Sequence, residues 1–291
     1  MPDAQRQVDV VRVRAGTRTA DRDHAATEEP LEIRLHGQPF AVIMRTPGAD
    51  RELAAGFLLA ERVLNAADDL GAIAHCTDPA AARVPEASSR SGRPDMSPPG
   101  AGAENIVDVM LAGGSAAFVD HVLADRRQVT TNSSCGLCGR RTIDSLAADA
   151  APIVARWTVA ADAIAAMPAG LRARQAVFDD TGGLHAAGLF ARDGRLLDIA
   201  EDVGRHNAVD KIVGRMLMRD ALPLSDYMLC VSGRTSFEIV QKAVFAGLPL
   251  VAAVSAPSTL AIELAETLGV TLIGFVRGDA FTIYAHPERV A

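Results

Sequence analysis

The sequence is short of aromatic residues and long apolar runs, and each shortage excludes a class of protein. Aromatic residues make up 4% of the 291 residues, with one Trp and two Tyr, so the core must be aliphatic. No apolar run reaches the roughly 18–20 residues that a membrane-spanning helix needs. Residues 1–22 are charged and hold no apolar segment of the kind found in secretory signals. We therefore expect a cytoplasmic protein with no membrane partner.

Basic charge is also in deficit. Lys plus Arg number 29 and Asp plus Glu number 36, which gives a net charge of −7 and an isoelectric point near 5.5. A protein that coats nucleic acid needs a basic field over its surface, so we expect no nucleic-acid partner. A local basic pocket for one anionic ligand remains compatible with this charge.

The first half of the chain changes composition several times. Residues 1–27 are polar and are predicted to be a disordered arm, and residues 28–155 a small α+β domain. Within this domain, residues 77–104 are rich in Pro, Ser, Gly and Ala, which predicts a disordered insertion because such a segment buries little apolar surface. Alternating and apolar patterns predict strands at 31–35, 40–44 and 106–111, and a helix over 51–64 with Asp50 as its N-cap.

The second half, residues 156–291, reads as an α/β domain. Continuous apolar runs alternate with helical patterns, which is typical of parallel strands buried on both faces. The turn Arg192-Asp193-Gly194-Arg195 predicts a hairpin. The predicted strands are 185–190, 196–199, 227–231, 250–254, 271–276 and an antiparallel edge strand at 281–284, and the predicted helices are 171–178, 206–218, 236–245 and 259–268.

Two of the four cysteines, Cys135 and Cys138, form a C-x-x-C pair in a polar loop, residues 128–141. Nearby arginines favour the thiolate, which is the nucleophilic form. The pair fits a redox dithiol, although no clear strand precedes it. It also fits half of a zinc site, although no second pair exists. A carrier that holds sulfur as a persulfide needs a mobile, exposed thiolate, which suits this loop best.

The predicted parallel strands end in polar turns, Ser232–Thr235, Ser255–Ser258 and Arg277–Asp279. Ligands of open parallel sheets bind beyond these strand ends. Helix N-termini and arginine both favour phosphate, so the turns predict either a phosphate or nucleotide pocket or ordinary helix caps with solvated arginines. Thr235 and Glu238 have the spacing of a capping box.

The segment Glu201–Lys211 gathers polar residues at a helix start. His206 and Asp210 are four residues apart and share a helix face, which allows an acid–base pair, a ligand-pocket wall, or a hydrogen-bonded helix start. His185 suggests a zinc deaminase, but Ala187 stands where the required Glu would be. Deamination is therefore excluded as the activity, and we expect no metal site.

Seven segments together resemble the FdhD family, the sulfur-carrier proteins required for formate dehydrogenase maturation. The similarity covers most of residues 28–290 and excludes the arm and the insertion. The matching segments are EEPLEIRLHG (28–37), SSCGLCGR (133–140), TGGLHAAGLF (181–190), EDVGRHNAVDKIVG (201–214), SGRTSFEIVQKA (232–243), AAVSAPSTLAIELAETLG (252–269) and GFVRGDAFTIY (274–284).

This resemblance implies a fold, a function and partners. The C-terminal domain would have a cytidine-deaminase-like fold. A cysteine desulfurase would load sulfur as a persulfide on Cys135, with Cys138 as its partner, in sulfurtransferase-type chemistry. The sulfur would pass to the molybdenum bis(molybdopterin guanine dinucleotide) cofactor, with GDP as a mimic, for formate dehydrogenase. The protein would be a homodimer, and the expected cofactor contacts are Phe275, Val276, Arg277, Gly278, Asp279, Ala280, Arg234 and His206.

One departure from the family pattern concerns the last segment. The family often has a basic residue and an Asn there, where this sequence has Asp279, Ala280 and Thr282, while Arg277 is retained. Two other functions compete with the sulfur carrier: a thiol–disulfide oxidoreductase and a zinc-binding module that senses nucleotides. Insulin reduction dependent on both cysteines would favour the first, and one tightly held zinc per chain the second.

Overall fold

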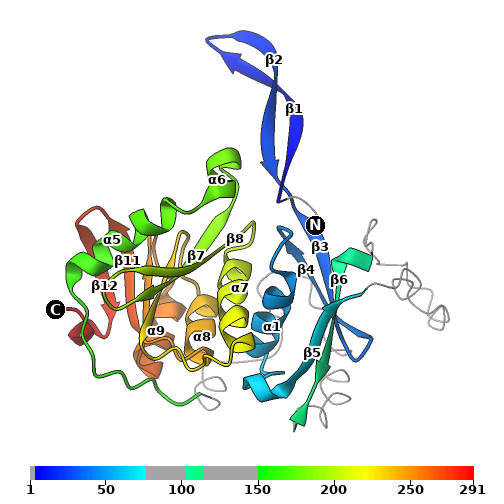
Figure 1. Cartoon of the computed structure of the whole chain (residues 1–291). Coiled ribbons are helices and arrows are strands. Elements are labelled where there is room, and N and C mark those ends of the chain that lie inside the picture. The colour runs from blue at the N-terminus through cyan, green and yellow to red at the C-terminus, as the bar shows by residue number, and fades with distance from the viewer. Residues whose placement is uncertain (1–3, 77–102, 114–149) are drawn as a thin grey trace.

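The computed structural model describes residues 4–76, 103–113 and 150–291. These residues form two β-sheets with helices between and around them, and a long two-stranded ribbon that projects from the body (Figure 1). The predicted α/β class is confirmed. The more specific deaminase-like fold and the predicted boundary between residues 155 and 156 remain predictions.

The larger sheet has six strands in the order β12-β11-β10-β9-β7-β8. Strands β9, β10 and β11 are parallel, and the other pairs are antiparallel. The predicted strands and the antiparallel edge strand are confirmed. Their bounds are β7 (His185–Ala191), β8 (Leu196–Asp202), β9 (Tyr227–Val231), β10 (Leu250–Ala253), β11 (Thr271–Arg277) and β12 (Ala280–Ala285).

Helices bury both faces of this sheet. On one face lie α7 (Arg205–Met218), α8 (Phe237–Phe245) and α9 (Thr259–Leu268), whose apolar side chains pack on those of alternate strand residues. On the other face lies α5 (Ala161–Arg172). The helix predicted over 171–178 is wrong, because the chain breaks between α5 and the short α6 (Ala176–Thr181).

The smaller sheet has four strands in the order β4-β3-β6-β5. They are β3 (Glu29–Leu35), β4 (Gln38–Arg45), β5 (Leu70–His75) and β6 (Ile106–Leu111), and α1 (Asp50–Ala60) packs on them. Asp50 is not the N-cap as predicted. Ala49 holds that position at φ 54°, and the Asp50 carboxylate instead accepts two hydrogen bonds from Arg45. Short 3-10 turns occur at Ala67–Asp69, Ala103–Asn105 and Pro287–Arg289.

The predicted disordered arm is a hairpin. Strands β1 (Gln5–Arg14) and β2 (Thr17–Ala26) pair antiparallel over ten residues each. The two turn residues, Ala15 and Gly16, both have positive φ angles, 47° and 82°, which is the geometry that matches the twist of a two-residue hairpin. Arg12 bridges to Asp21 and Asp23 across the strands. Alternating valines in β1 are the signal for this hairpin that a purely compositional interpretation misses.

Helices α1 and α7 join the two sheets into one core. They cross so closely that each presents a glycine to the other's backbone: a Cβ added to Gly56 would lie 2.0 Å from the Asp210 carbonyl oxygen, and one added to Gly214 would lie 1.9 Å from that of Glu52. Only glycine fits at such a crossing. The position of α7, and therefore of its N-terminal residues, is fixed by this contact.

Some predictions concern residues that are not described. The Cys135–Cys138 loop and most of the predicted insertion, residues 77–102, lie outside the described residues. None of the helices in the described part of the chain combines the length and apolar character that crossing a bilayer requires.

Candidate functional site

Three loops meet at the carboxyl ends of the parallel strands, where the sequence predicts a ligand site. The loop after β9 pairs with the loop after β10, because Thr235 N donates to Ala256 O at 3.2 Å and Ser258 N donates to Thr235 O at 3.0 Å. The loop after β10 is joined to the end of β11 by Phe275 N, which donates to Ser255 O at 3.3 Å. Backbone hydrogen bonds therefore hold the three loops as one surface.

Phe275 is the most unusual residue of this surface. The residue is 40% exposed although its side chain is large and apolar, and its φ angle is 55°, a left-handed conformation that bulky residues rarely adopt. Such strain persists only where the surroundings impose it, and it is often found at ligand sites. The Arg277 guanidinium lies 5.8 Å from the ring centroid. Together they present a flat, cationic face suited to stacking with an aromatic base.

The other predicted contacts of this segment differ in accessibility. The side chain of Val276 is fully buried in the core, so only its backbone could reach a ligand, whereas Gly278, Asp279 and Ala280 are exposed at the β11–β12 turn. Arg234 is also exposed, in the loop after β9.

A second group of polar residues lies where α7 begins. His206 Nε2 is 3.0 Å from Ser236 Oγ and 3.6 Å from the Glu238 carboxylate. A Cβ on Gly233 would lie 3.2 Å from His185 Nδ1 and 3.6 Å from Arg205 Cδ. The side chains of His185 and Arg205 therefore lie next to Gly233, where a larger residue would crowd them. Arg205 Nε is buried and has no hydrogen-bond partner among the described residues.

The electrostatics of this group favour an anion. Burial, followed by the charges of Arg205 and Lys242, lowers the pKa of His206 to about 4, against the opposing charge of Glu238. Burial and then Arg205 also lower the pKa of His185. Both imidazoles are therefore neutral at pH 7, and the fixed positive charge comes from arginine. A buried guanidinium nitrogen without a partner is ready to donate to a phosphate or another anion.

The predicted capping box is wrong. Helix α8 begins at Phe237 with Ser236 as its N-cap, and the Ser236 side chain does not cap it. Thr235 is 1% exposed and its hydroxyl has no partner among the described residues, while the Ser236 hydroxyl is 3.0 Å from His206. The first N–H groups of α8 therefore remain without a cap from Ser236 beside His206, in contrast to α9, where Ser258 accepts from Ala261 N.

The suggested acid–base pair of His206 and Asp210 does not form. Both carboxylate oxygens of Asp210 accept hydrogen bonds from Lys242 Nζ, at 2.7 and 2.8 Å. Burial raises the pKa of Asp210 to about 6 against the attraction of Lys242. His206 and Asp210 are four residues apart on α7, as predicted, but the Asp210 carboxylate binds Lys242 of the neighbouring α8 instead of His206. The interpretation of His206 as part of a pocket wall fits the geometry better.

Cys230 is not a candidate for sulfur chemistry. Cys230 is fully buried in β9, and burial raises the pKa of its thiol to about 12. Cys76 is half-buried. Within the described residues no group of three or more His, Cys, Asp or Glu side chains could hold a metal ion. Cys135 and Cys138, the predicted reactive pair, lie outside the described residues.

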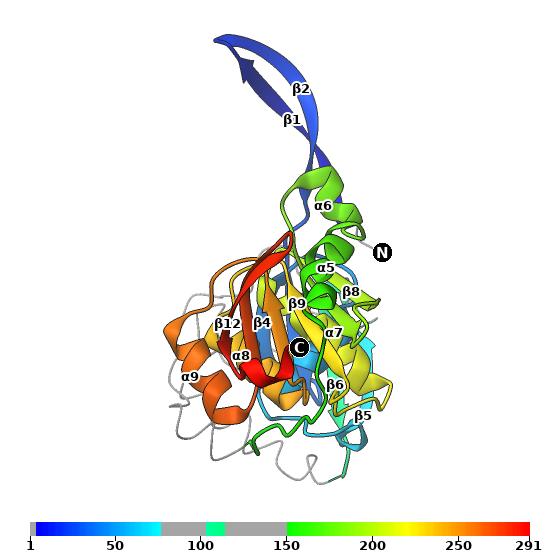
Figure 2. The same ribbon diagram turned by 90° about the vertical axis from the view of Figure 1, so that its left-hand side faces the viewer.

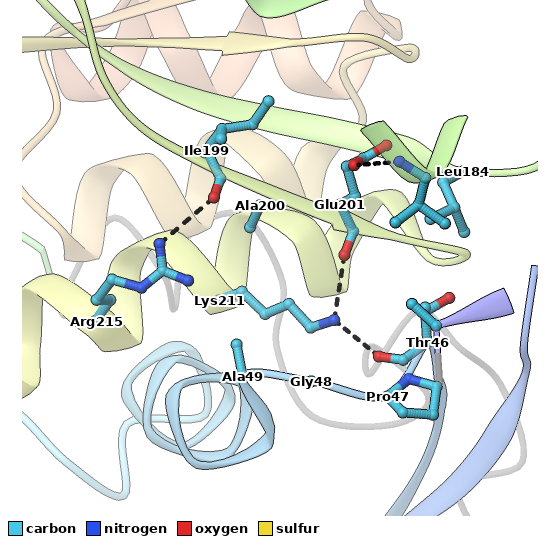
Figure 3. Close-up of a pocket in the computed structure, with 12 residues that line it drawn as sticks. Thr46, Pro47, Gly48, Ala49, Leu184, Ile199, Ala200, Glu201, Lys211 and Arg215 are labelled. Carbon is cyan, nitrogen blue, oxygen red and sulfur yellow. Dashed lines mark hydrogen bonds between the residues drawn. The ribbon is translucent and has the colours of Figure 1, made fainter. Parts of the chain in front are cut away.

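A small pocket of about 190 Å³ lies elsewhere, between the two sheets (Figure 3). Lys211 and Arg215 line it, but both of these cations are paired with carboxylates of the same chain. Lys211 Nζ lies 2.7 Å from the Asp202 carboxylate and 2.9 Å from Thr46 O, and Arg215 pairs with Asp198. We interpret this pocket as a structural junction rather than the ligand site.

The depressed pKa of His206 predicts a pH-dependent stability. The unfolded chain binds a proton near pH 6.5 and the folded chain only near pH 4, so unfolding becomes easier as pH falls through this window. The loss is up to about 3 kcal/mol. Denaturation of wild type and His206→Gln at about pH 7.5 and about pH 4.5 should show the variant losing less stability. The raised pKa of Asp210 makes the folded protein more stable as pH falls, and this opposite contribution is present in both the wild type and the variant. Equal losses would show that His206 is not held neutral.

Comparison with known sequences identifies the family to which this chain belongs. The model of the FdhD/NarQ family matches residues 26–291. The chain is 49% identical over 290 residues to "Sulfur carrier protein FdhD" of Streptomyces avermitilis, covering 97% of this chain and 94% of the relative. It is 46% identical over 268 residues to the protein of the same name from Mycobacterium tuberculosis, covering 91% of each chain.

A solved structure has the same fold. The crystal structure of a candidate formate dehydrogenase accessory protein from Desulfotalea psychrophila superposes with a TM-score of 0.73 and 22% sequence identity, covering 99% of this chain and 100% of that one. At this identity the likeness shows the fold alone. The long sequence match and the relatives at nearly half identity show more, and they place the present chain in the FdhD/NarQ family.

Proposed function

We propose that this chain is a sulfur carrier that serves formate dehydrogenase. In this proposal Cys135 takes sulfur from a cysteine desulfurase as a persulfide, and the sulfur is transferred to the molybdenum bis(molybdopterin guanine dinucleotide) cofactor, which is the substrate. Support comes from family membership and from relatives named sulfur carrier proteins. The protein would work in the cytoplasm.

The loading step follows thiol chemistry. The Cys135 thiolate attacks the outer sulfur of the desulfurase persulfide, the S–S bond of that persulfide breaks, and the desulfurase cysteine leaves as a thiolate. The loading step consumes no oxidant or reductant, because the transferred sulfur keeps its oxidation state. For delivery, the Cys138 thiolate attacks the Cys135 sulfur, which releases sulfide to the cofactor and leaves a Cys135–Cys138 disulfide that a cellular thiol must reduce.

The observation that carries the cofactor part of the proposal is the exposed, strained Phe275 with Arg277 beside its ring. This face suits a guanine base. The Arg205 Nε, which has no hydrogen-bond partner in the part of the chain that the structure describes, and the start of α8 supply donors for phosphate. Base and phosphate groups are the two parts that a guanine dinucleotide would present.

The nucleotide part of the proposal predicts a loss of affinity. Arg277→Ala should weaken binding of GDP, used as the mimic, by about 1.5–3 kcal/mol, because a charged hydrogen bond from its guanidinium to the nucleotide is lost. This corresponds to roughly a 10- to 150-fold rise in Kd, measured by calorimetric titration. Arg192 is the matched control, because its guanidinium also lies 5.8 Å from an aromatic ring, that of Trp157, on another part of the surface. Arg192→Ala should bind GDP as wild type does, and equal affinities for all three proteins would remove Arg277 from the site.

The whole proposal is tested in cells that lack this chain. Such cells should make formate dehydrogenase protein without formate dehydrogenase activity, and supplying the chain should restore the activity. Full activity without the chain would contradict the proposal. Purified protein that carries one tight zinc ion per chain, or that reduces insulin through both cysteines, would favour the competing functions instead.

A further inference from the structure

Two buried polar residues, Thr46 and Asp202, join the two sheets at the turn that precedes Arg205. Thr46 follows β4 of the smaller sheet, which lies on the far side of α1 and α7 from the larger sheet (Figures 1 and 2). Asp202 is the last residue of β8 in the larger sheet. Thr46 is 2% exposed and Asp202 is fully buried. The function proposed above gives neither residue a part.

The Asp202 carboxylate binds four donors. One of its oxygens accepts hydrogen bonds from Gly204 N and Asn207 Nδ2, each at 2.8 Å. The other accepts from Thr46 N at 3.2 Å and lies 2.7 Å from Lys211 Nζ. Burying a carboxylate without such partners would be very unfavourable. The donors belong to the end of β4, to the β8–α7 turn and to α7, so one side chain ties these three segments together.

The Thr46 hydroxyl holds the same turn from the smaller sheet. Val203 N donates to Thr46 Oγ1 at 3.2 Å, and Lys211 Nζ donates to Thr46 O at 2.9 Å (Figure 3). Val203 and Gly204 are the two residues before Arg205, and a buried side chain of this junction binds the backbone N–H of each. The backbone from which Arg205 extends is therefore fixed in part by the sheet that does not carry the ligand-binding loops.

Arg205 is the residue for which this matters. Its Nε is buried and has no hydrogen-bond partner among the described residues, and its side chain lies next to Gly233 in the loop after β9. A guanidinium binds phosphate through a planar fork, so its orientation decides the strength of the contact. A site that is about 1 Å too loose loses much of its function. The turn that sets the direction of Arg205 therefore bears on nucleotide affinity.

We propose that Thr46 and Asp202 are positioning residues, which hold the β8–α7 turn so that the Arg205 guanidinium is directed at a phosphate of the bound nucleotide. This inference rests on the nucleotide part of the proposed function. The smaller sheet contributes to nucleotide affinity through the turn, and not through a contact with the nucleotide. Because coupling between two sites is reciprocal, a bound nucleotide also stabilises the junction around Thr46.

The Thr46 hydroxyl is the smallest part of the junction that can be removed. Thr46→Val keeps the shape of the side chain but loses the acceptor for Val203 N, so the Kd of GDP should rise roughly 3- to 30-fold, measured by calorimetric titration. Thr46→Ser keeps the hydroxyl and should bind GDP as the wild type does. Thermal denaturation checks that each variant is folded.

Thr271→Val is the matched control. Thr271 is also fully buried, and its hydroxyl also makes hydrogen bonds, to His286 O at 2.9 Å and from Arg289 at 3.0 Å. It lies at the start of β11, at the opposite end of the strand from the candidate site. This variant should lose stability and bind GDP with wild-type affinity. If it weakens binding as much as Thr46→Val does, a general loss of stability explains both results and the inference is wrong.

A double-mutant cycle tests whether Thr46 acts through Arg205. Arg205→Ala alone should raise the Kd of GDP roughly 10- to 150-fold. In the Arg205→Ala background, Thr46→Val should raise it no further, because the side chain that Thr46 positions is gone. Wild-type affinity of Thr46→Val beside a weakened Arg205→Ala, or the same loss from Thr46→Val in both backgrounds, would overturn the inference.

Hydrogen exchange supplies a second measurement, which needs no variant and so does not depend on whether Thr46→Val folds. Saturating GDP should slow exchange in the wild-type peptides that contain Thr46 and Val203, and should leave the peptide that contains Thr271 unchanged. Unchanged exchange at Thr46 and Val203 with GDP bound would contradict the inference. A wild type that does not bind GDP would instead contradict the nucleotide part of the proposed function, and with it the site on which this inference rests.

Discussion

Replacing Cys135 by Ala is expected to reduce formate dehydrogenase activity to the background of cells without the chain. The proposed loading step needs a thiolate to attack the desulfurase persulfide, and the buried Cys230 cannot supply one. The pKa of Cys230 is raised to about 12 in the core, so its thiolate is scarce at pH 7. The measurement is formate dehydrogenase activity in cells that carry only the variant, with the variant's amount checked by blotting.

Cys230→Ala is the control for this experiment. It also removes one sulfur atom, but from a fully buried side chain in β9, and it should retain formate dehydrogenase activity. If Cys135→Ala supports activity at the wild-type level, sulfur does not travel on that residue. If both variants fail, lost stability rather than lost chemistry explains the result, and circular dichroism of the two proteins decides this.

The second large effect concerns the fold. Gly214→Ala should destabilise the protein by about 3 kcal/mol or more, or prevent folding, because the new methyl group would lie 1.9 Å from the Glu52 carbonyl oxygen in the facing helix. Since α1 and α7 meet backbone to backbone, no side chain can move aside to make room. The free energy of unfolding from denaturant titration measures the effect.

Gly170 is the matched control, because it is also a helical glycine. A Cβ there would lie 3.7 Å from the Phe190 ring, an ordinary contact. Gly170→Ala should therefore be neutral or stabilise the protein by roughly 0.5–1 kcal/mol, since alanine is the better helix former. Equal stabilities of the two variants would mean that α1 and α7 are not in close contact.

The fold of the second half could be predicted because its signals are local. Strands β9, β10 and β11 are continuous apolar runs, and turns with Gly, Ser or Pro separate them from amphipathic helices. The edge strand β12 was also predicted from a short apolar run. The N-terminal hairpin was missed because its strands are rich in charged residues and largely exposed, and only the alternating valines and the Ala15–Gly16 turn indicate it.

The errors at the candidate site have a common cause. In each case the side chain binds a hydrogen-bond partner that lies about 30 residues away in the sequence. Asp210 faces His206 on its own helix, yet Lys242 from α8 binds it. Ser236 was expected inside the helix, yet it is the N-cap and its hydroxyl is hydrogen-bonded to His206. The left-handed backbone of Phe275 also has no sequence signal, because it is imposed by neighbouring strands and loops.

The central claim is that sulfur travels on Cys135, and mass spectrometry tests it most directly. The purified chain is incubated with a cysteine desulfurase and cysteine, alkylated, digested and analysed peptide by peptide. We predict that the peptide with Cys135 gains the mass of one sulfur atom, and that the peptide with Cys230 does not. A chain that gains no sulfur, or gains it on another cysteine alone, would contradict the account.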